Sequence, residues 1–188
     1  MASDLIVKAL GETLFADPPG SDPQDKVYAV LDGAASETLL ADLYRLEPKF
    51  ECLYRGEIEP DLAWVAPYLV LVEPDSEFAR FLFGSGWGKN WGVFVTTQAE
   101  FDDVRSHLRR FLMVHTSDGK PLYFRYYDPR VLREFLPIAD SEQIKTMFGP
   151  LKAWFGEGMD ENEMLRFEAP DGAMVKKSVD LKKVTGRK

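Results

Sequence analysis

Four short apolar runs at regular intervals are the feature that most constrains how this chain can fold. They are VYAVLD (27–32), APYLVLVE (66–73), WGVFVTT (91–97) and PLYFRYYD (121–128). Each run has the length and the β-branched and aromatic content of a strand, and stretches with helical spacing separate them. Strands that alternate with helices predict a layered α/β domain with a largely buried sheet. We expect a mixed sheet of about four to six strands with alternating helices.

Helix-start signals follow several of these runs. Thr97 and Glu100 have the spacing of a capping box, in which each side chain satisfies a free backbone N–H of the first helical turn. Asp140 and Gln143 have the same spacing before MFGPLKAWF. The two pairs predict helices that begin after residues 97 and 140.

The expected sheet domain covers residues 27–156. Residues 1–26 form a lead-in segment that ends in the breaker DPPGSDPQD. Residues 157–188 form a short C-terminal extension with one candidate strand, MLRFEAP, and a basic tail. From 176 to 188 there are six basic residues and one acid, a charge run typical of a solvated, mobile end.

Composition argues against several classes of function. The 188 residues carry a net charge of −8, whereas nucleic-acid binding needs clustered Lys and Arg, so no nucleic-acid partner is expected. No run approaches the roughly 18 apolar residues of a membrane span, and the first residues do not resemble a signal peptide. A single cysteine, Cys52, excludes an internal disulfide and a cysteine-based zinc site. We expect a soluble cytoplasmic protein with no cofactor and no metal.

The sequence contains no complete motif for phosphate binding, metal binding or nucleophilic catalysis. FGSGWGKNWG (83–92) lacks the Ser or Thr that a phosphate-binding loop needs at Asn90, and it connects a helix to a strand rather than a strand to a helix. His107 and His115 lie eight residues apart, which is not the i, i+4 spacing of a helical metal pair. No serine lies in a G-x-S-x-G elbow. We therefore expect no catalytic residues.

The stretch YFRYYDPRVLREFL (123–136) joins the fourth run to a helix. Asp128 is well placed as an N-cap, and Pro129 fits the first helical position because its missing N–H has no helical partner there. Arg125 lies in an aromatic run, where an arginine needs a carboxylate partner. Asp128 and Asp32 are both candidates for that partner. The alternatives for Arg125 are a structural ion pair and a surface that binds another protein.

These residues resemble a known family. YFRYYDPRVL, preceded by HLRRFLMV and followed by FGPLKAWF, is similar to the signature of the adaptor-chaperone family of bacterial type VI secretion, long catalogued as a domain of unknown function. VYAVLDGA, APYLVLVE and WGVFVTT match in the family's order, so the resemblance spans about residues 27–155. It implies a non-enzymatic function, because members bind a toxic effector in the cytoplasm and help load it onto the valine-glycine repeat spike protein, VgrG.

The resemblance also assigns the motif to particular positions of this chain. They are Arg125, Tyr127, Asp128, Pro129, Arg130 and Leu132, with Phe148, Gly149, Pro150 and Trp154 downstream. The motif marks the fold and does not by itself identify a contact with cargo. Many relatives have a helical lobe after the shared domain, whereas only about 30 residues follow it here. The resemblance therefore implies a different or smaller cargo surface.

The preferred hypothesis is an effector adaptor chaperone whose partners are an effector and VgrG. Aromatic anchors supply contact area, and a negative field favours basic partner segments. The candidate partner-binding or motif residues are Arg125, Tyr127, Asp128, Arg130, Trp87, Trp91 and Trp154, with Trp64 and Tyr68 as further aromatic candidates. The alternatives are an immunity protein that neutralises a basic toxin and a hydrolase that works through the region of His107, His115 and Asp128.

Overall fold

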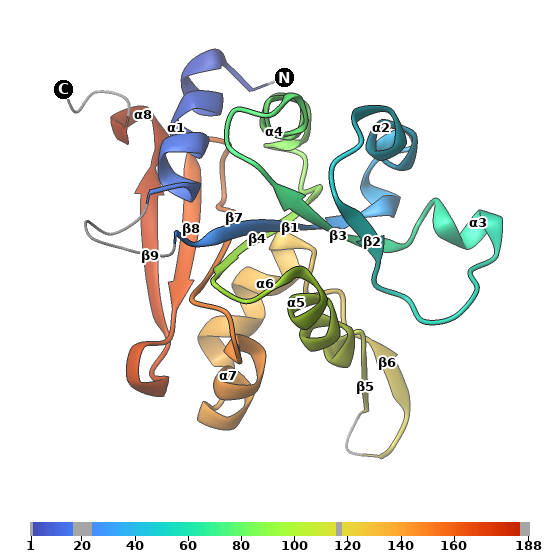
Figure 1. The fold of residues 1–188 in the computed structure, drawn as a ribbon. Helices are drawn as coiled ribbons and strands as arrows, with labels where there is room; N and C mark the ends of the chain where they lie inside the picture. The colour runs from blue at the N-terminus through green and yellow to red at the C-terminus, as the bar shows by residue number, and fades with distance from the viewer. Residues whose placement is uncertain (1, 17–23, 116–117, 185–188) are drawn as a thin grey trace.

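A seven-stranded sheet forms the centre of the protein in a computed structural model that describes residues 2–16, 24–115 and 118–184 (Figure 1). Within those residues the strand order is β2-β3-β1-β4-β7-β8-β9, and every neighbouring pair is antiparallel. The strands are β1 (Lys26–Asp32), β2 (Phe50–Cys52), β3 (Pro67–Val72), β4 (Gly92–Thr97), β7 (Ala153–Glu157), β8 (Glu163–Glu168) and β9 (Val175–Asp180).

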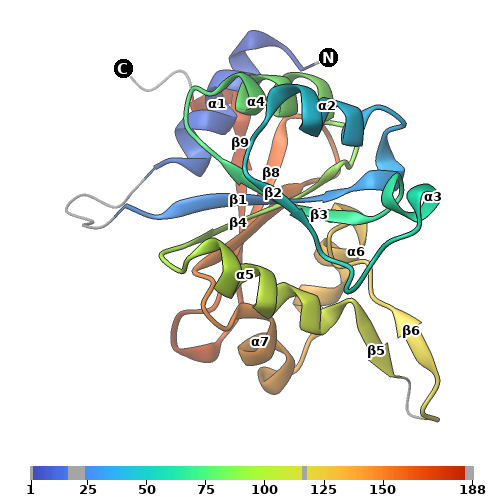
Figure 2. The same cartoon turned by 45° about the vertical axis from the view of Figure 1, so that its right-hand side comes forward.

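Helices cover both faces of this sheet, as Figures 1 and 2 show. α1, α2, α4 and α8 lie over one face, and α5, α6 and α7 lie over the other. The helices are α1 (Asp4–Leu14), α2 (Leu39–Leu46), α3 (Pro60–Ala63), α4 (Glu77–Phe81), α5 (Phe101–Leu108), α6 (Pro129–Phe135), α7 (Ser141–Phe148) and α8 (Leu181–Val184). The predicted layered α/β class is confirmed, but the sheet has seven strands rather than four to six and is antiparallel rather than mixed, because the C-terminal segment adds β8 and β9. Among the described residues, every helix is too short or too polar to span a bilayer.

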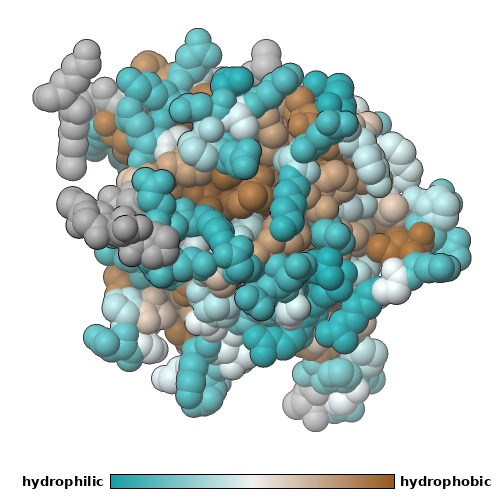
Figure 3. Space-filling model, viewed as in Figure 1, coloured by the Kyte–Doolittle hydropathy of each residue, from teal (hydrophilic) through white to brown (hydrophobic). Residues whose placement is uncertain are grey.

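Two hydrophobic cores lie between these layers. Successive side chains of a strand point to opposite faces, so Ala29 and Leu31 of β1 enter the core under α1 and α2, while Tyr28 and Val30 enter the core under α5 and α7. A strand buried on both faces must be apolar throughout, which explains the continuous run at 27–32. On the face of the molecule that Figure 3 shows, polar residues cover most of the surface, with apolar residues visible between them.

The C-terminal part of the chain belongs to the sheet. MLRFEAP, the candidate strand, overlaps β8, and the following segment pairs with it as β9. We expected the basic tail from residue 176 onward to be a mobile end. That expectation is wrong up to Asp180, because antiparallel pairing with β8 holds these residues as an edge strand. Leu181 at the start of α8 is fully buried. Residues 185–188 and most of the predicted breaker at 17–25 lie outside the described residues.

The fourth predicted strand differs from the prediction. β6 (Pro121–Tyr123) is short and pairs with β5 (Met113–His115) in a separate hairpin that projects from the body (Figure 2). The chain then turns, because the backbone N–H of Asp128 donates to the carbonyl of Arg125 at 3.0 Å. The alternation expected for 121–128 is lost as a result, and the adjacent Tyr126 and Tyr127 are both buried.

One predicted capping box is confirmed and the other is wrong. Asp140 and Gln143 exchange side-chain-to-backbone bonds of 2.8 and 2.9 Å at the start of α7. At the start of α5, Glu100 occupies the N-cap position and its side chain makes no capping bond. The Thr97 hydroxyl instead donates to the carbonyl of Pro150 at 2.6 Å. That long-range bond ties the end of β4 to the segment before β7.

Candidate functional site

Three buried carboxylates gather where β1 and β7 end and α6 begins. Asp32 ends β1, Glu157 ends β7, and Asp128 is the N-cap of α6. The strands bring two of them together, since β4 lies between β1 and β7 and pairs with both. The third joins them because α6 packs on β7, where Pro129 lies against Gly156. A group of buried acids requires cationic or hydrogen-bonding partners.

Each of these carboxylates has an arginine from the motif region beside it. Arg125 forms an ion pair with Asp32, whose side chain is 4% exposed against 47% for the arginine. Arg130 holds Asp128 with two charge-assisted bonds, Nη2 to Oδ2 at 2.7 Å and Nε to Oδ1 at 2.9 Å. A third arginine, Arg133, lies close enough to Glu157 to favour its charged form. The motif region therefore supplies two ion pairs and a third arginine near Glu157, which together we call the ion-pair network.

Asp32, rather than Asp128, is the partner of Arg125. Its carboxylate also accepts the backbone N–H of Ala34 at 3.1 Å and so caps the short 3₁₀ turn Gly33–Ala35. The hydrogen bond with Asp32 raises the pKa of Arg125. The predicted structural ion pair is thus present, although half of the arginine side chain faces solvent.

Asp128 has the predicted capping role. Its carboxylate accepts the backbone N–H of Arg130 at 2.9 Å, and Pro129 follows at the first helical position. Burial raises the pKa of Asp128, but the bonds from Arg130 outweigh burial and hold that pKa below its ordinary value. The charged carboxylate is therefore the stable form in the folded protein.

Sequence reasoning missed Glu157. Its Oε1 accepts the backbone N–H of Asn90 at 3.0 Å, and the N–H groups of Gly88 and Lys89 point to the same carboxylate. Positive φ angles at Gly88 and Asn90 curl the loop into this cradle. The glycine-rich stretch, predicted to be only a connection, thus encloses an acid. Burial raises the pKa of Glu157 to about 7. The sequence signal that could have identified Glu157 is an acid at the end of the otherwise apolar strand AWFGE.

The three tryptophans expected as surface anchors lie in the protein interior. Trp87, Trp91 and Trp154 are all buried, and the Trp87 indole donates to the carbonyl of Glu161 at 2.7 Å. The prediction that these tryptophans contact a partner is therefore wrong, because their side chains are packed in the hydrophobic cores. Tyr68 is buried as well, whereas Trp64 is about half exposed beside α3.

The histidines of the hydrolase hypothesis lie in different surroundings. His107 is buried, with Nε2 3.0 Å from the carbonyl of Met147 and Nδ1 2.5 Å from a guanidinium nitrogen of Arg110. His115 is exposed on the β5–β6 hairpin. Burial lowers the pKa of His107, so its imidazole is held neutral. Across the described ranges, no cluster of His, Cys, Asp or Glu could hold a metal ion.

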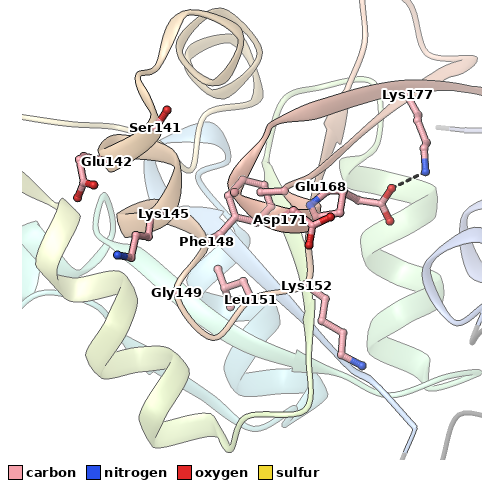
Figure 4. A pocket seen from close by; sticks show the side chains of 13 residues that line it. Ser141, Glu142, Lys145, Phe148, Gly149, Leu151, Lys152, Glu168, Asp171 and Lys177 are labelled. Atoms are coloured by element: carbon pink, nitrogen blue, oxygen red, sulfur yellow. Dashed lines mark hydrogen bonds and ion pairs between the residues drawn. The ribbon is translucent and has the colours of Figure 1, made fainter.

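Two hollows are relevant to binding. The larger, of about 820 Å³, lies between α7 and the β8–β9 turn (Figure 4). Two lysines of its lining are in ion pairs, Lys177 with Glu168 at 2.5 Å and Lys152 with Asp25 at 2.5 Å. The other, of about 540 Å³, lies on the outer side of α6 next to the ion-pair network. Its walls are mainly carbon, which is typical of a surface that contacts another apolar surface.

Residues 27–146 match the family described as "Domain of unknown function (DUF4123)". The chain belongs to the DUF4123 family. The match runs from β1 into α7 and confirms the resemblance at the level of this domain, which is associated with effector adaptor function in type VI secretion. It includes Asp32, Asp128 and the three arginines of the network, whereas Glu157 lies beyond it. No curated protein and no solved structure matches the chain.

Proposed function

We propose that this DUF4123 protein is a cytoplasmic adaptor chaperone that binds a type VI secretion effector and helps load it onto VgrG, without catalysing a reaction. The observation that carries the proposal is the family match over residues 27–146. The ion-pair network is consistent with it, since Arg125 and Arg130 of the motif are paired with Asp32 and Asp128. Such a network stabilises the fold and leaves binding to the surface around it.

Exposed apolar side chains next to the motif also support a binding role. Leu122 and Tyr123 on the hairpin and Ile138 after α6 are all more than half exposed. Large exposed apolar patches, as distinct from single exposed apolar residues, mark interaction sites on protein surfaces. An adaptor that holds a secreted toxin needs a surface of this kind.

The test is co-expression of the full chain with each effector and spike protein encoded beside its gene, followed by size-exclusion chromatography. We expect at least one effector to elute together with the adaptor. Separate elution of folded protein from all of these candidates would contradict the proposal.

A secretion assay distinguishes the adaptor from an immunity protein. Deleting the gene of an adaptor abolishes export of the effector and leaves the producing cell resistant to the toxin. Deleting the gene of an immunity protein makes the cell sensitive to its own toxin and leaves export intact. We expect the first outcome.

A further inference from the structure

α6 and the 3₁₀ turn after it carry two apolar stripes. Leu132 and Leu136 face the sheet and are fully buried. Val131, Phe135 and Ile138 follow a second stripe at i, i+4 and i+7, on the outer side of the same segment. Ile138 is 82% exposed. A surface helix of a globular protein needs one apolar stripe, so the second indicates that another element packs there.

Phe124, the residue after β6, forms one edge of the hollow of about 540 Å³ on the outer side of α6, which we call the groove. Phe124 leaves β6 and packs edge-to-face on Phe135, with ring centroids 4.8 Å apart. Leu122, two residues earlier, is 56% exposed and lies opposite Val114 in the hairpin. The groove is therefore a shallow, open hollow of about 540 Å³ along α6, with Phe124 at one edge and Leu122 outside its lining.

The chemistry of the groove selects a helix as its occupant. Its floor offers carbon, with polar groups only at Asp128, Arg130 and Glu134 along one side. An extended segment would leave backbone N–H and C=O groups unpaired against such a floor, whereas a helix satisfies its own backbone. Apolar residues at helical spacing can then interdigitate with the stripe on α6, as in other helix-in-groove complexes.

Charges along the rim indicate how that helix is oriented. Arg130 uses Nε and Nη2 to hold Asp128, and Nη1 has no hydrogen-bond partner in the part of the chain that the structure describes. Glu134, one turn later, is exposed and forms no ion pair with any described residue. A carboxylate of the occupant therefore suits the Arg130 end, and a cationic side chain suits the Glu134 end.

We propose that the groove formed by Phe124, Val131, Phe135 and Ile138 binds an amphipathic helix of the effector, with an acidic residue of that helix at Arg130. The inference rests on the proposed function and names the surface and the class of segment that it uses. The groove lies within the family match, which ends at residue 146.

The experiment compares full-length variants against the effectors and spike proteins encoded beside the gene. Ile138→Glu places a charge on the exposed end of the stripe without disturbing the core. Tyr44→Glu is the matched control, since Tyr44 is 68% exposed on α2, over the opposite face of the sheet. We expect the Kd to rise by about tenfold or more for Ile138→Glu and to stay unchanged for Tyr44→Glu, with both variants melting like the parent.

Three outcomes are distinguishable. Loss of binding by Ile138→Glu alone supports the groove. Equal binding by both variants and the parent overturns the groove and leaves the proposed function standing. Failure of the folded parent chain to bind any of these proteins overturns the proposed function, and the groove falls with it.

Crosslinking tests the class of occupant. With p-benzoylphenylalanine in place of Ile138, the captured effector segment should carry apolar residues at i, i+3 or i+4 spacing and an acid close by. Capture of a proline-rich or extended segment, or of a second copy of this chain, would overturn the assignment of an effector helix.

Discussion

The Arg125 guanidinium covers the buried carboxylate of Asp32, which lies 93 residues earlier in the chain. The pair joins the turn after the β5–β6 hairpin to the end of β1. Asp32 is enclosed and Arg125 is half open to water, so the two partners are affected differently when one is removed.

Replacing Arg125 with alanine should destabilise the protein by about 1–3 kcal/mol, because among the described residues it leaves the Asp32 carboxylate with a single hydrogen bond, from the N–H of Ala34. This is less than the roughly 3–5 kcal/mol of a fully buried pair, because water reaches half of the Arg125 side chain. Urea unfolding measures the change. The combination Arg125→Ala with Asp32→Asn should recover part of the loss.

Lys183→Ala is the control, since Lys183 pairs with Asp180 at the surface and its loss should leave the urea midpoint unchanged. If Arg125→Ala unfolds at the parent's midpoint and binds an effector less tightly, then Arg125 serves recognition and the structural interpretation is wrong.

Local chemistry made part of this structure predictable. The capping roles of Asp128 and Asp140 depend on residues within one helical turn, so the sequence contains all the information that they require. The runs at 27–32 and 66–73 are strands because their composition suits a sheet buried on both faces.

Long-range pairing was not predictable from the same signals. β9 is polar and lysine-rich, and only its partner β8 makes it a strand. Thr97 satisfies the local spacing rule of a capping box, but its hydroxyl bonds to Pro150, 53 residues away. Sequence composition likewise favoured Trp87 and Trp154 as anchors, whereas their burial depends on the packing of both layers.

Glu157 should make stability fall as pH rises between about 4.5 and 7. Burial raises the pKa of its folded carboxyl from 4.5 to about 7, so over that window the folded protein keeps a proton that the unfolded chain has lost. The loss is on the order of 3 kcal/mol and is complete above pH 7. Urea unfolding at several pH values measures it.

Glu157→Gln mimics the protonated acid and should flatten this part of the profile. Asp128, whose pKa is lowered, acts only at lower pH, where its protonation removes stability. An unchanged slope between pH 5 and 7 in Glu157→Gln would show that another group titrates there.

Gly149 should not tolerate a side chain. Its φ of 46° and ψ of −113° suit glycine, and an added Cβ would lie 2.3 Å from Cε1 of His107. Gly149→Ala should therefore lose about 2–5 kcal/mol by combining backbone strain with overpacking. Thermal unfolding measures the loss. Gly119→Ala is the matched variant, since Gly119 also has a positive φ but open space around it. Equal losses in the two variants would mean that contact with His107 contributes nothing.

Substitutions at Thr97 and Glu100 distinguish the observed tertiary hydrogen bond from the predicted capping box. The Thr97 hydroxyl donates to the Pro150 carbonyl at 2.6 Å and accepts the Ala99 N–H at 3.0 Å. Thr97→Val keeps the shape of the buried side chain but removes both hydrogen bonds of its hydroxyl, so it should lose about 1–3 kcal/mol in urea unfolding. Glu100→Gln should leave stability unchanged, because the Glu100 side chain makes no capping bond and its pair with Lys26 is exposed. A larger loss of stability in Glu100→Gln than in Thr97→Val would support the predicted capping box. It would also contradict the conclusion that Thr97 links β4 to the segment before β7.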